Sequence, residues 1–140
     1  MTSPADYLAA AARVALAGIG TFLFESREQV TVSLNSAPLP AIILYAYTLA
    51  QAGPSARVES AAVTLYFGDA TPGSNDDAAA AYATQQRMRV LKQRFLAALD
   101  ANMLAQLDGL KDTGFEAAYE ARLDGVGCQF TLTVPAVALC

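Results

Sequence analysis

The sequence predicts an α+β domain with a mostly antiparallel sheet of about five strands, on which an N-terminal helix and one long helix pack. Two segments have helical periodicity, one near the N-terminus and one beginning at about residue 77. The segments between and after them repeat apolar residues at every second position, as half-buried strands do. Because the strands come in runs of three and two, the expected order is α-β-β-β-α-β-β, which favours antiparallel or mixed pairing over a parallel sheet.

The first helix is expected over residues 4–17. Ser3 is a suitable N-cap, proline follows at the first helical position where no N–H is needed, and Asp6 lies near the positive end of the helix dipole. Gly18 and Gly20 are expected to end the helix, because glycine readily adopts the left-handed conformation. A narrow apolar stripe predicts packing against a sheet or a neighbouring subunit. It consists of Leu8, Ala11, Ala12, Ala15 and Leu16.

Three strands are expected before the second helix, at residues 21–34, 41–49 and 58–67. Pro38 and Pro40 indicate a loop between the first two, because proline cannot donate to a β-ladder. The second strand is apolar on both faces, as a central strand is. The third strand alternates, with Ala61, Val63, Leu65 and Phe67 on its inward face. Turn-forming residues from Gly68 to Asp77 predict an exposed loop after it.

The long helix is expected over residues 77–104, and a hairpin follows it. The helix has an inward stripe of Met88, Leu91, Phe95, Ala98 and Leu99. Its basic residues Arg87, Arg89, Lys92 and Arg94 are interpreted as its solvated side, with a local basic patch as the alternative. Asp108-Gly109 and Asp112-Thr113-Gly114 are expected to break the chain. Two strands at residues 115–123 and 127–134 are then joined by Asp124-Gly125-Val126-Gly127, and the second points Cys128, Phe130, Leu132 and Val134 inward.

Composition limits the classes of protein. A length of 140 residues predicts one domain, residues 1–140. The formal net charge of -4 disfavours a nucleic-acid partner. No basic n-region precedes the N-terminal apolar stretch, which Arg13 interrupts, so neither a signal peptide nor a membrane span is expected, and the cytoplasm is the expected location. Cys128 and Cys140 are interpreted as free thiols, with a bridge between them left open.

The sequence offers little catalytic chemistry. It contains no histidine, which excludes Ser-His-Asp and Cys-His catalysis. Six acids remain candidates for carboxylate catalysis but are interpreted as solvated surface: Glu25, Glu28, Glu59, Asp69, Glu116 and Glu120. The glycines form no phosphate-binding motif, and the aspartates near residue 76 do not have the spacing of a calcium loop. We therefore expect no cofactor, no metal and no enzymatic activity.

The order of elements resembles the tail-completion, tail-terminator and neck proteins of tailed bacteriophages and prophages. The resemblance rests on the opening helix with Phe24-Glu25-Ser26-Arg27, the run from Val63 to Asp69, the polar loop to Asn75-Asp76, the helical segment Lys92-Gln93-Arg94-Phe95-Leu96, and the run from Gly125 to Leu132. It spans most of the chain but includes no invariant signature. It implies a small α+β subunit that forms a homo-oligomeric ring at the head–tail joint, in the cytoplasm during assembly and then in a virion or tail-like particle.

The resemblance also implies where such a subunit meets its neighbours. Two loops are candidates for contacts between rings, with Ser36, Pro38 and Pro40 in the first and Asp69, Asn75 and Asp76 in the second. The alternative hypothesis is a small-molecule binding module, whose pocket lies between the sheet and the long helix. Tyr45, Tyr66 and Gln85 would ring that pocket, although the aromatic residues Tyr45, Tyr47, Tyr66 and Phe67 are more simply explained as cross-strand core pairs.

Overall fold

The computed structural model describes residues 3–23, 40–50, 57–70, 78–102, 104–113 and 123–135. These form two helices and a five-stranded mixed sheet, in the predicted order. The elements are α1 (Pro4–Leu16), β1 (Thr21–Leu23), β2 (Ala41–Leu49), β3 (Val58–Ala70), α3 (Ala78–Asp100), β4 (Gln106–Thr113) and β5 (Leu123–Pro135). The strand order in the sheet is β1-β2-β3-β5-β4, and β1 pairs with β2 in parallel while the other pairs are antiparallel. The predicted α+β class is therefore confirmed.

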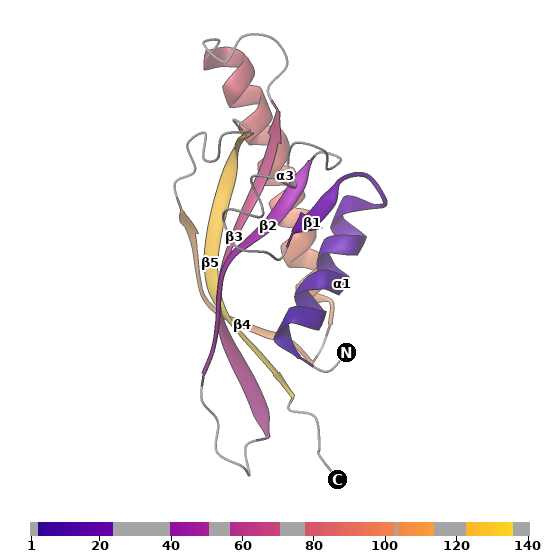
Figure 1. The fold of residues 1–140 in the computed structure, drawn as a ribbon, viewed down its shortest axis with the longest axis vertical. Coiled ribbons are helices and arrows are strands. Elements are labelled where there is room, and N and C mark those ends of the chain that lie inside the picture. Colours follow the sequence, from indigo (N-terminus) through magenta and orange to yellow (C-terminus); the bar gives the residue numbers. More distant parts are fainter. Residues whose placement is uncertain are drawn as a thin grey trace.

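Both helices cover the same face of the sheet, and α1 packs against α3 beside it (Figure 1). The core lies between this helical layer and the sheet, and it contains the apolar stripes that the sequence predicted. From the helices come Leu8, Ala11, Ala12, Ala15, Leu16, Met88, Leu91, Phe95 and Leu99, and from β3 and β5 come Ala61, Val63, Leu65, Phe67, Cys128, Phe130, Leu132 and Val134. Ala98 is partly buried against this cluster. The other face of the sheet carries no described helix.

Local chemistry fixes both ends of α1. The Ser3 Oγ accepts a hydrogen bond from the Asp6 N–H, and the Asp6 carboxylate accepts one from the Ser3 N–H, which forms a capping box. Ala17 ends the helix with a left-handed φ of 52°, one residue before the expected glycine. Gly20 is needed for a different reason, since a Cβ there would lie 2.2 Å from the Pro40 carbonyl oxygen beside β2.

The strands β2 and β3 lie where the sequence predicted, and β3 is longer. The first four residues of β2 are buried, and a register shift between Leu44 and Ala46 separates them from its more exposed second half. The expected loop at residues 68–77 is wrong in its first part, because Gly68, Asp69 and Ala70 continue β3 and pair with β5. Of the predicted strand 21–34, the structure describes residues 21–23, which form β1.

The last two strands, β4 and β5, form an antiparallel pair. The predicted strand at residues 127–134 lies within β5, whereas β4 at residues 106–113 was not predicted as a strand. The expected breaks at Asp108-Gly109 and Asp112-Thr113 lie within β4, and the expected turn at residues 124–127 lies within β5. Gly109 has a φ of 66° and occupies an irregularity in the β4–β5 register, so it marks a bulge. Gly125 allows close cross-strand approach, because a Cβ there would lie 1.8 Å from the Phe67 carbonyl oxygen. Residues 114–122 lie outside the described part.

The long helix α3 ends at Asp100, four residues before its predicted end. Asn102 forms the turn that follows: its N–H donates to the Leu99 carbonyl oxygen, and its side-chain oxygen accepts a hydrogen bond from the Leu104 N–H. Asparagine competes for backbone groups in this way and so favours the end of a helix. Neither α1 nor α3, the two helices of the described part, is long and apolar enough to cross a membrane.

Candidate functional site

The candidate contact residues that the structure describes lie at one end of the sheet. Ala41 of β2 is the cross-strand partner of Gly68 of β3, so the preceding Pro40 and the following Asp69 are neighbours at that end. Pro40 is partly buried and its carbonyl oxygen accepts a hydrogen bond from the Thr21 N–H at 3.0 Å. The other four candidates, Ser36, Pro38, Asn75 and Asp76, lie outside the described residues.

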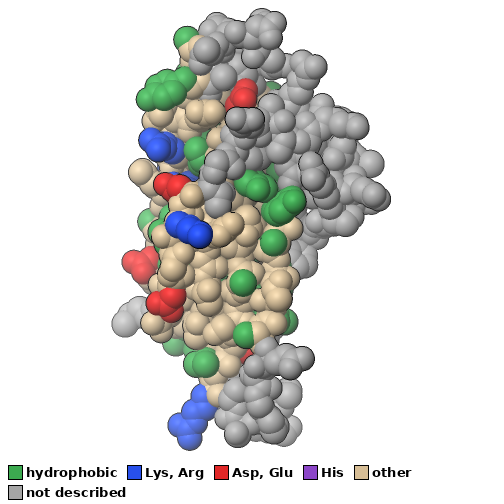
Figure 2. Space-filling view, turned by 90° about the vertical axis from the view of Figure 1, so that its left-hand side faces the viewer, with side chains coloured by type: hydrophobic (Ala, Val, Ile, Leu, Met, Phe, Trp, Pro, Cys, Tyr) green, Lys and Arg blue, Asp and Glu red, His purple; other side chains and the backbone are tan. Residues whose placement is uncertain are grey.

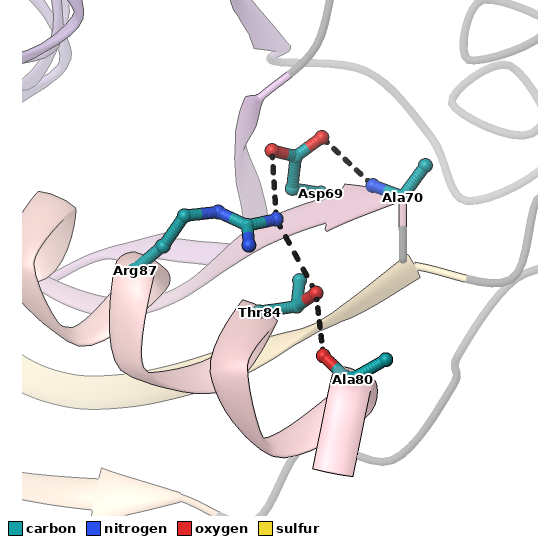
Figure 3. A network of polar contacts seen from close by, with 5 residues as sticks. All are labelled: Asp69, Ala70, Ala80, Thr84 and Arg87. Atoms are coloured by element: carbon teal, nitrogen blue, oxygen red, sulfur yellow. Dashed lines mark hydrogen bonds and ion pairs between the residues drawn. The ribbon is translucent and has the colours of Figure 1, made fainter. Parts of the chain in front are cut away.

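Asp69 belongs to a polar network that joins β3 to α3 (Figure 3). Its Oδ2 lies 3.7 Å from the Arg87 guanidinium, and its Oδ1 accepts a hydrogen bond from the Ala70 N–H at 2.8 Å. Arg87 also donates to the Thr84 Oγ1, which donates in turn to the Ala80 carbonyl oxygen within the helix. Asp69 is thus engaged within the subunit rather than projecting from a loop. Thr84 is fully buried, and these hydrogen bonds allow a hydroxyl group to lie in the core.

The described acids are spread over strands and helices, and the two described candidates for carboxylate catalysis, Glu59 and Asp69, both lie on β3. Glu59 and Asp69 lie near opposite ends of β3, about 33 Å apart at the rise of an extended strand. Asp69 and Asp124 are cross-strand partners, but Asp69 also has the Arg87 guanidinium beside it. Within the described ranges, no three acidic, cysteine or histidine side chains gather into a group that could hold a metal ion. Glu25, Glu28, Glu116 and Glu120 lie outside those ranges, so the interpretation of these four acids as solvated surface stays a prediction.

Lys92 departs from the expectation that the basic residues of α3 form its solvated side. Only 10% of its side chain is exposed, and its ammonium group lies 2.5 Å from the Asp112 carboxylate of β4. The pair ties the helix to the edge strand across the inner face of the sheet, where Asp112 is the cross-strand partner of Cys128. Arg87, Arg89 and Arg94 are exposed, as predicted. Helical periodicity predicted Lys92 to be solvated, because the sequence did not show that β4 would lie beside it.

Cys128 is a free cysteine buried in the core. Burial raises the pKa of its thiol to about 12, and the nearby Asp112 carboxylate adds to this effect while the Lys92 ammonium group opposes it. Because the thiolate is the nucleophile, such a cysteine is unreactive at neutral pH. Cys140 lies outside the described residues.

The tyrosines occupy both faces of the sheet. Tyr47 packs against the core, and its hydroxyl oxygen accepts a hydrogen bond from the Ala5 N–H, one of the helix-start donors that have no partner within α1. Burial raises the pKa of Tyr47. Tyr45 and Tyr66 form an edge-to-face pair with ring centroids 5.2 Å apart. Because Tyr66 alternates with core residues of β3, it faces away from α3, so Tyr66 and Gln85 lie on opposite sides of the sheet.

The face of the sheet opposite the helices is here called the outer face, and three of its strands carry long stretches without charge, whereas Asp108 and Lys111 of β4 lie beside them. No charged residue occurs in residues 41–49 of β2, 60–68 of β3 or 125–135 of β5. The outward side chains of the three strands are small or hydroxylic at the centre, where a depression of about 220 Å³ is lined in part by Ala46, Thr48, Ala62, Thr64, Gln129 and Thr131. Figure 2 looks onto this face, and the charged side chains lie along one edge and toward the ends.

A second depression lies on the helical side. It has a volume of about 230 Å³ and runs between the C-terminal end of α1 and the middle of α3. Neither this groove nor the composition of the outer face was among the sequence-based site predictions. The outer face had a signal in the sequence, since three strand segments without any charge are unusual for a sheet with one solvated face. The groove had none, because it depends on how α1 and α3 pack.

Comparison of the chain with protein-family models and with curated protein sequences found no match. The functional argument therefore rests on the surfaces described above.

Proposed function

We propose that the chain is a structural assembly subunit of a phage or a phage-like tail particle that pairs with a second copy through the outer face of its sheet, and that a ring at the head–tail joint closes through further head-to-tail contacts between such pairs. The observation that carries the proposal is the uncharged stretch across β2, β3 and β5. Charged residues are depleted at the cores of protein interfaces, because burying an unpaired charge costs several kcal/mol, whereas burying alanine does not and burying threonine is tolerated when its hydroxyl is hydrogen-bonded.

A second copy of the same chain suits this face better than a charged partner. A self-complementary interface places the same patch on both subunits, so a charged patch would repel its own copy and an uncharged patch does not. The short side chains at Ala46, Ala62 and Thr64 also let two sheets approach to the roughly 10 Å spacing of stacked sheets. Tyr45 is 47% exposed, and exposed tyrosine rings are enriched among the residues that contribute most to binding at protein interfaces.

The phage setting is supported by the resemblance in the order of elements and by the fold class. Contacts between successive rings would involve the sheet end that carries Pro40 and Asp69, together with the predicted loop residues near 36–38 and 75–76. This part of the proposal concerns which particle the subunit builds, and self-association does not depend on it. The genes beside the one that encodes the chain test it, because genes for a portal, a capsid and a tail tube are expected there.

The small-molecule alternative stays a hypothesis. Of the residues expected to line its pocket, Gln85 lies on α3 while Tyr45 and Tyr66 form their pair across β2 and β3. The depressions described above, of about 220 and 230 Å³, lie below the roughly 300 Å³ at which pockets for drug-sized ligands begin. A small-molecule site in either depression would therefore need a ligand smaller than that class.

Light scattering of the purified chain over a series of micromolar concentrations tests self-association. The decisive variant is Ala62→Glu, which places a carboxylate at the centre of the outer face, and the matched control is Ala97→Glu at an exposed position of α3. We expect the wild type and the control to form the same oligomer, and Ala62→Glu to shift the population to monomer while keeping its circular dichroism spectrum. A monomeric wild type, or an oligomer that Ala62→Glu leaves intact, would refute the proposal.

A further inference from the structure

The groove between α1 and α3 combines an apolar floor with exposed apolar walls. Met88 and Leu91, which are core residues of α3, reach its floor together with Leu16 of α1. Its walls include Ile19, which is 68% exposed, and Val90, which is 47% exposed. Large apolar side chains that stay in water beside a hollow are a feature of surfaces that bind a partner.

Two arginines flank this apolar strip. Arg87 and Arg94 both line the groove and are seven residues apart on α3, which is two helical turns or about 10 Å along the axis. Arg87 contacts Asp69 at 3.7 Å, and its side chain remains 48% exposed. No carboxylate of the described part pairs with Arg94. The groove therefore presents one guanidinium group at each end of an apolar strip.

The chemistry of the groove selects its occupant. Guanidinium groups bind carboxylates through paired hydrogen bonds, so the strip fits an occupant with an acidic group at each end. Its volume of about 230 Å³ suits one or two apolar side chains rather than a cofactor. Proteins bind membranes rich in anionic lipid through clusters of about four to eight basic residues, and they bind nucleic acids through a basic face. This groove has two arginines in a chain of net charge -4, so neither partner fits it as well as an acidic peptide does.

We propose that this groove binds a peptide segment of a partner protein in which apolar side chains are flanked by two carboxylates about 10 Å apart. That distance corresponds to acidic residues three apart in an extended segment, at about 3.3 Å per residue, or seven apart in a helix. The groove lies on the helical layer, opposite the outer face of the sheet. The inference therefore goes beyond self-association. Pairing through the outer face keeps this groove accessible, and its only described lining residue among the candidates for ring-to-ring contacts is Pro40.

The test begins with a displayed library of random peptides selected on the full chain. Selected peptides are then synthesised with a fluorescent label, and their affinity is measured by anisotropy. We expect a consensus of apolar residues between two acidic positions at one of the two spacings. Arg94→Glu is expected to weaken the binding of such a peptide by roughly five- to thirty-fold, since it removes one exposed ion pair and adds a repulsion. Val90→Asp is expected to abolish binding.

The matched control is Arg89→Glu, which makes the same change of charge on an exposed part of α3 that does not line the groove. It should change affinity by less than about two-fold, because an exposed charge outside the contact is screened by salt. The proposal is overturned if no peptide is selected, if the selected peptides lack the acidic pair, or if both arginine variants weaken binding equally. Binding of the chain to phosphatidylserine vesicles that depends on Arg94, without a selected peptide, would assign the groove to a membrane surface instead.

Discussion

Gly125→Ala should be among the most damaging single-methyl changes in the described part of the chain, and Gly109→Ala is its matched control. Both glycines follow an aspartate and both were expected in breaks or turns, yet both lie within strands. An added Cβ at Gly125 would lie 1.8 Å from the Phe67 carbonyl oxygen and 3.0 Å from the Gly68 Cα. These are backbone atoms, so no side-chain rotation relieves the overlap, and β3 and β5 must separate locally.

The size of the effect follows from the register. Ordinary contact with the Phe67 oxygen requires a local shift of about 1.5 Å, which is large enough to break hydrogen bonds among the four residue pairs from Phe67–Val126 to Ala70–Leu123. At about 1 kcal/mol for each of two to four bonds, Gly125→Ala should lower the free energy of unfolding by about 2–4 kcal/mol. Gly109 has a φ of 66° with open space around it, so alanine there adds only backbone strain, about 1 kcal/mol after the gain in unfolded-state entropy.

Urea unfolding followed by circular dichroism, at one fixed protein concentration, measures both variants. Hydrogen exchange resolved by residue should show lost amide protection at residues 67–70 in Gly125→Ala, while the amides of α1 keep theirs. If Gly125→Ala lowers the free energy of unfolding no more than Gly109→Ala does, or if amide protection is lost evenly over the chain, then the close approach of β5 to β3 is not the reason that glycine is needed at position 125.

Three further predictions concern the core and its buried polar groups. Phe95→Ala should lower the free energy of unfolding by about 3–5 kcal/mol, because Phe95 is fully buried against Phe67, and urea unfolding at an unchanged m-value checks it. Asp112→Ala should lower the free energy of unfolding by about 1–2 kcal/mol, because it leaves the mostly buried Lys92 ammonium group without its carboxylate partner. Lys92→Met should lower it less, and a larger loss for Lys92→Met in the same assay would contradict this reasoning. Because the folded chain keeps the Cys128 thiol protonated, this thiol contributes its full stability below pH 9, the ordinary pKa of a thiol. Above pH 9 the free energy of unfolding should fall by about 1.4 kcal/mol per pH unit, until the pH reaches the raised pKa of about 12. Cys128→Ala should lack this slope in unfolding experiments between pH 9 and 11.

Much of the fold was predictable because local patterns agreed with the tertiary structure. The capping box at Ser3, the alternation of β3 and the stripe on α3 each specify an element and its buried face without reference to the rest of the chain. In the strands, the failures occurred at glycines. A glycine that permits a turn and a glycine that permits close backbone approach look the same in one sequence, so Gly109 and Gly125 were assigned to breaks and turns when they belong to strands.

The candidate site was less predictable, since it consists of surfaces and not of a motif. Of the six candidate contact residues, Asp69 proved to be bound to Arg87 of α3, a contact between residues eighteen positions apart that no periodicity reveals. The burial of Lys92 likewise could not be predicted from the sequence, because it depends on the contact with Asp112 of β4, whereas Arg89 and Arg94 are exposed.

The amino-acid sequence by itself determined the class of the fold, the order of its elements and the inward stripes of α1, α3, β3 and β5, because helix caps and the periods of 3.6 and 2 residues act over a few positions. It also determined that β2, β3 and β5 carry no charge along most of their length. Only the tertiary structure decided that the uncharged parts of these strands lie side by side on the outer face, that α1 and α3 enclose a groove between two arginines, and that Lys92 is buried. Such features depend on the distance between residues far apart in the chain, which is fixed by packing.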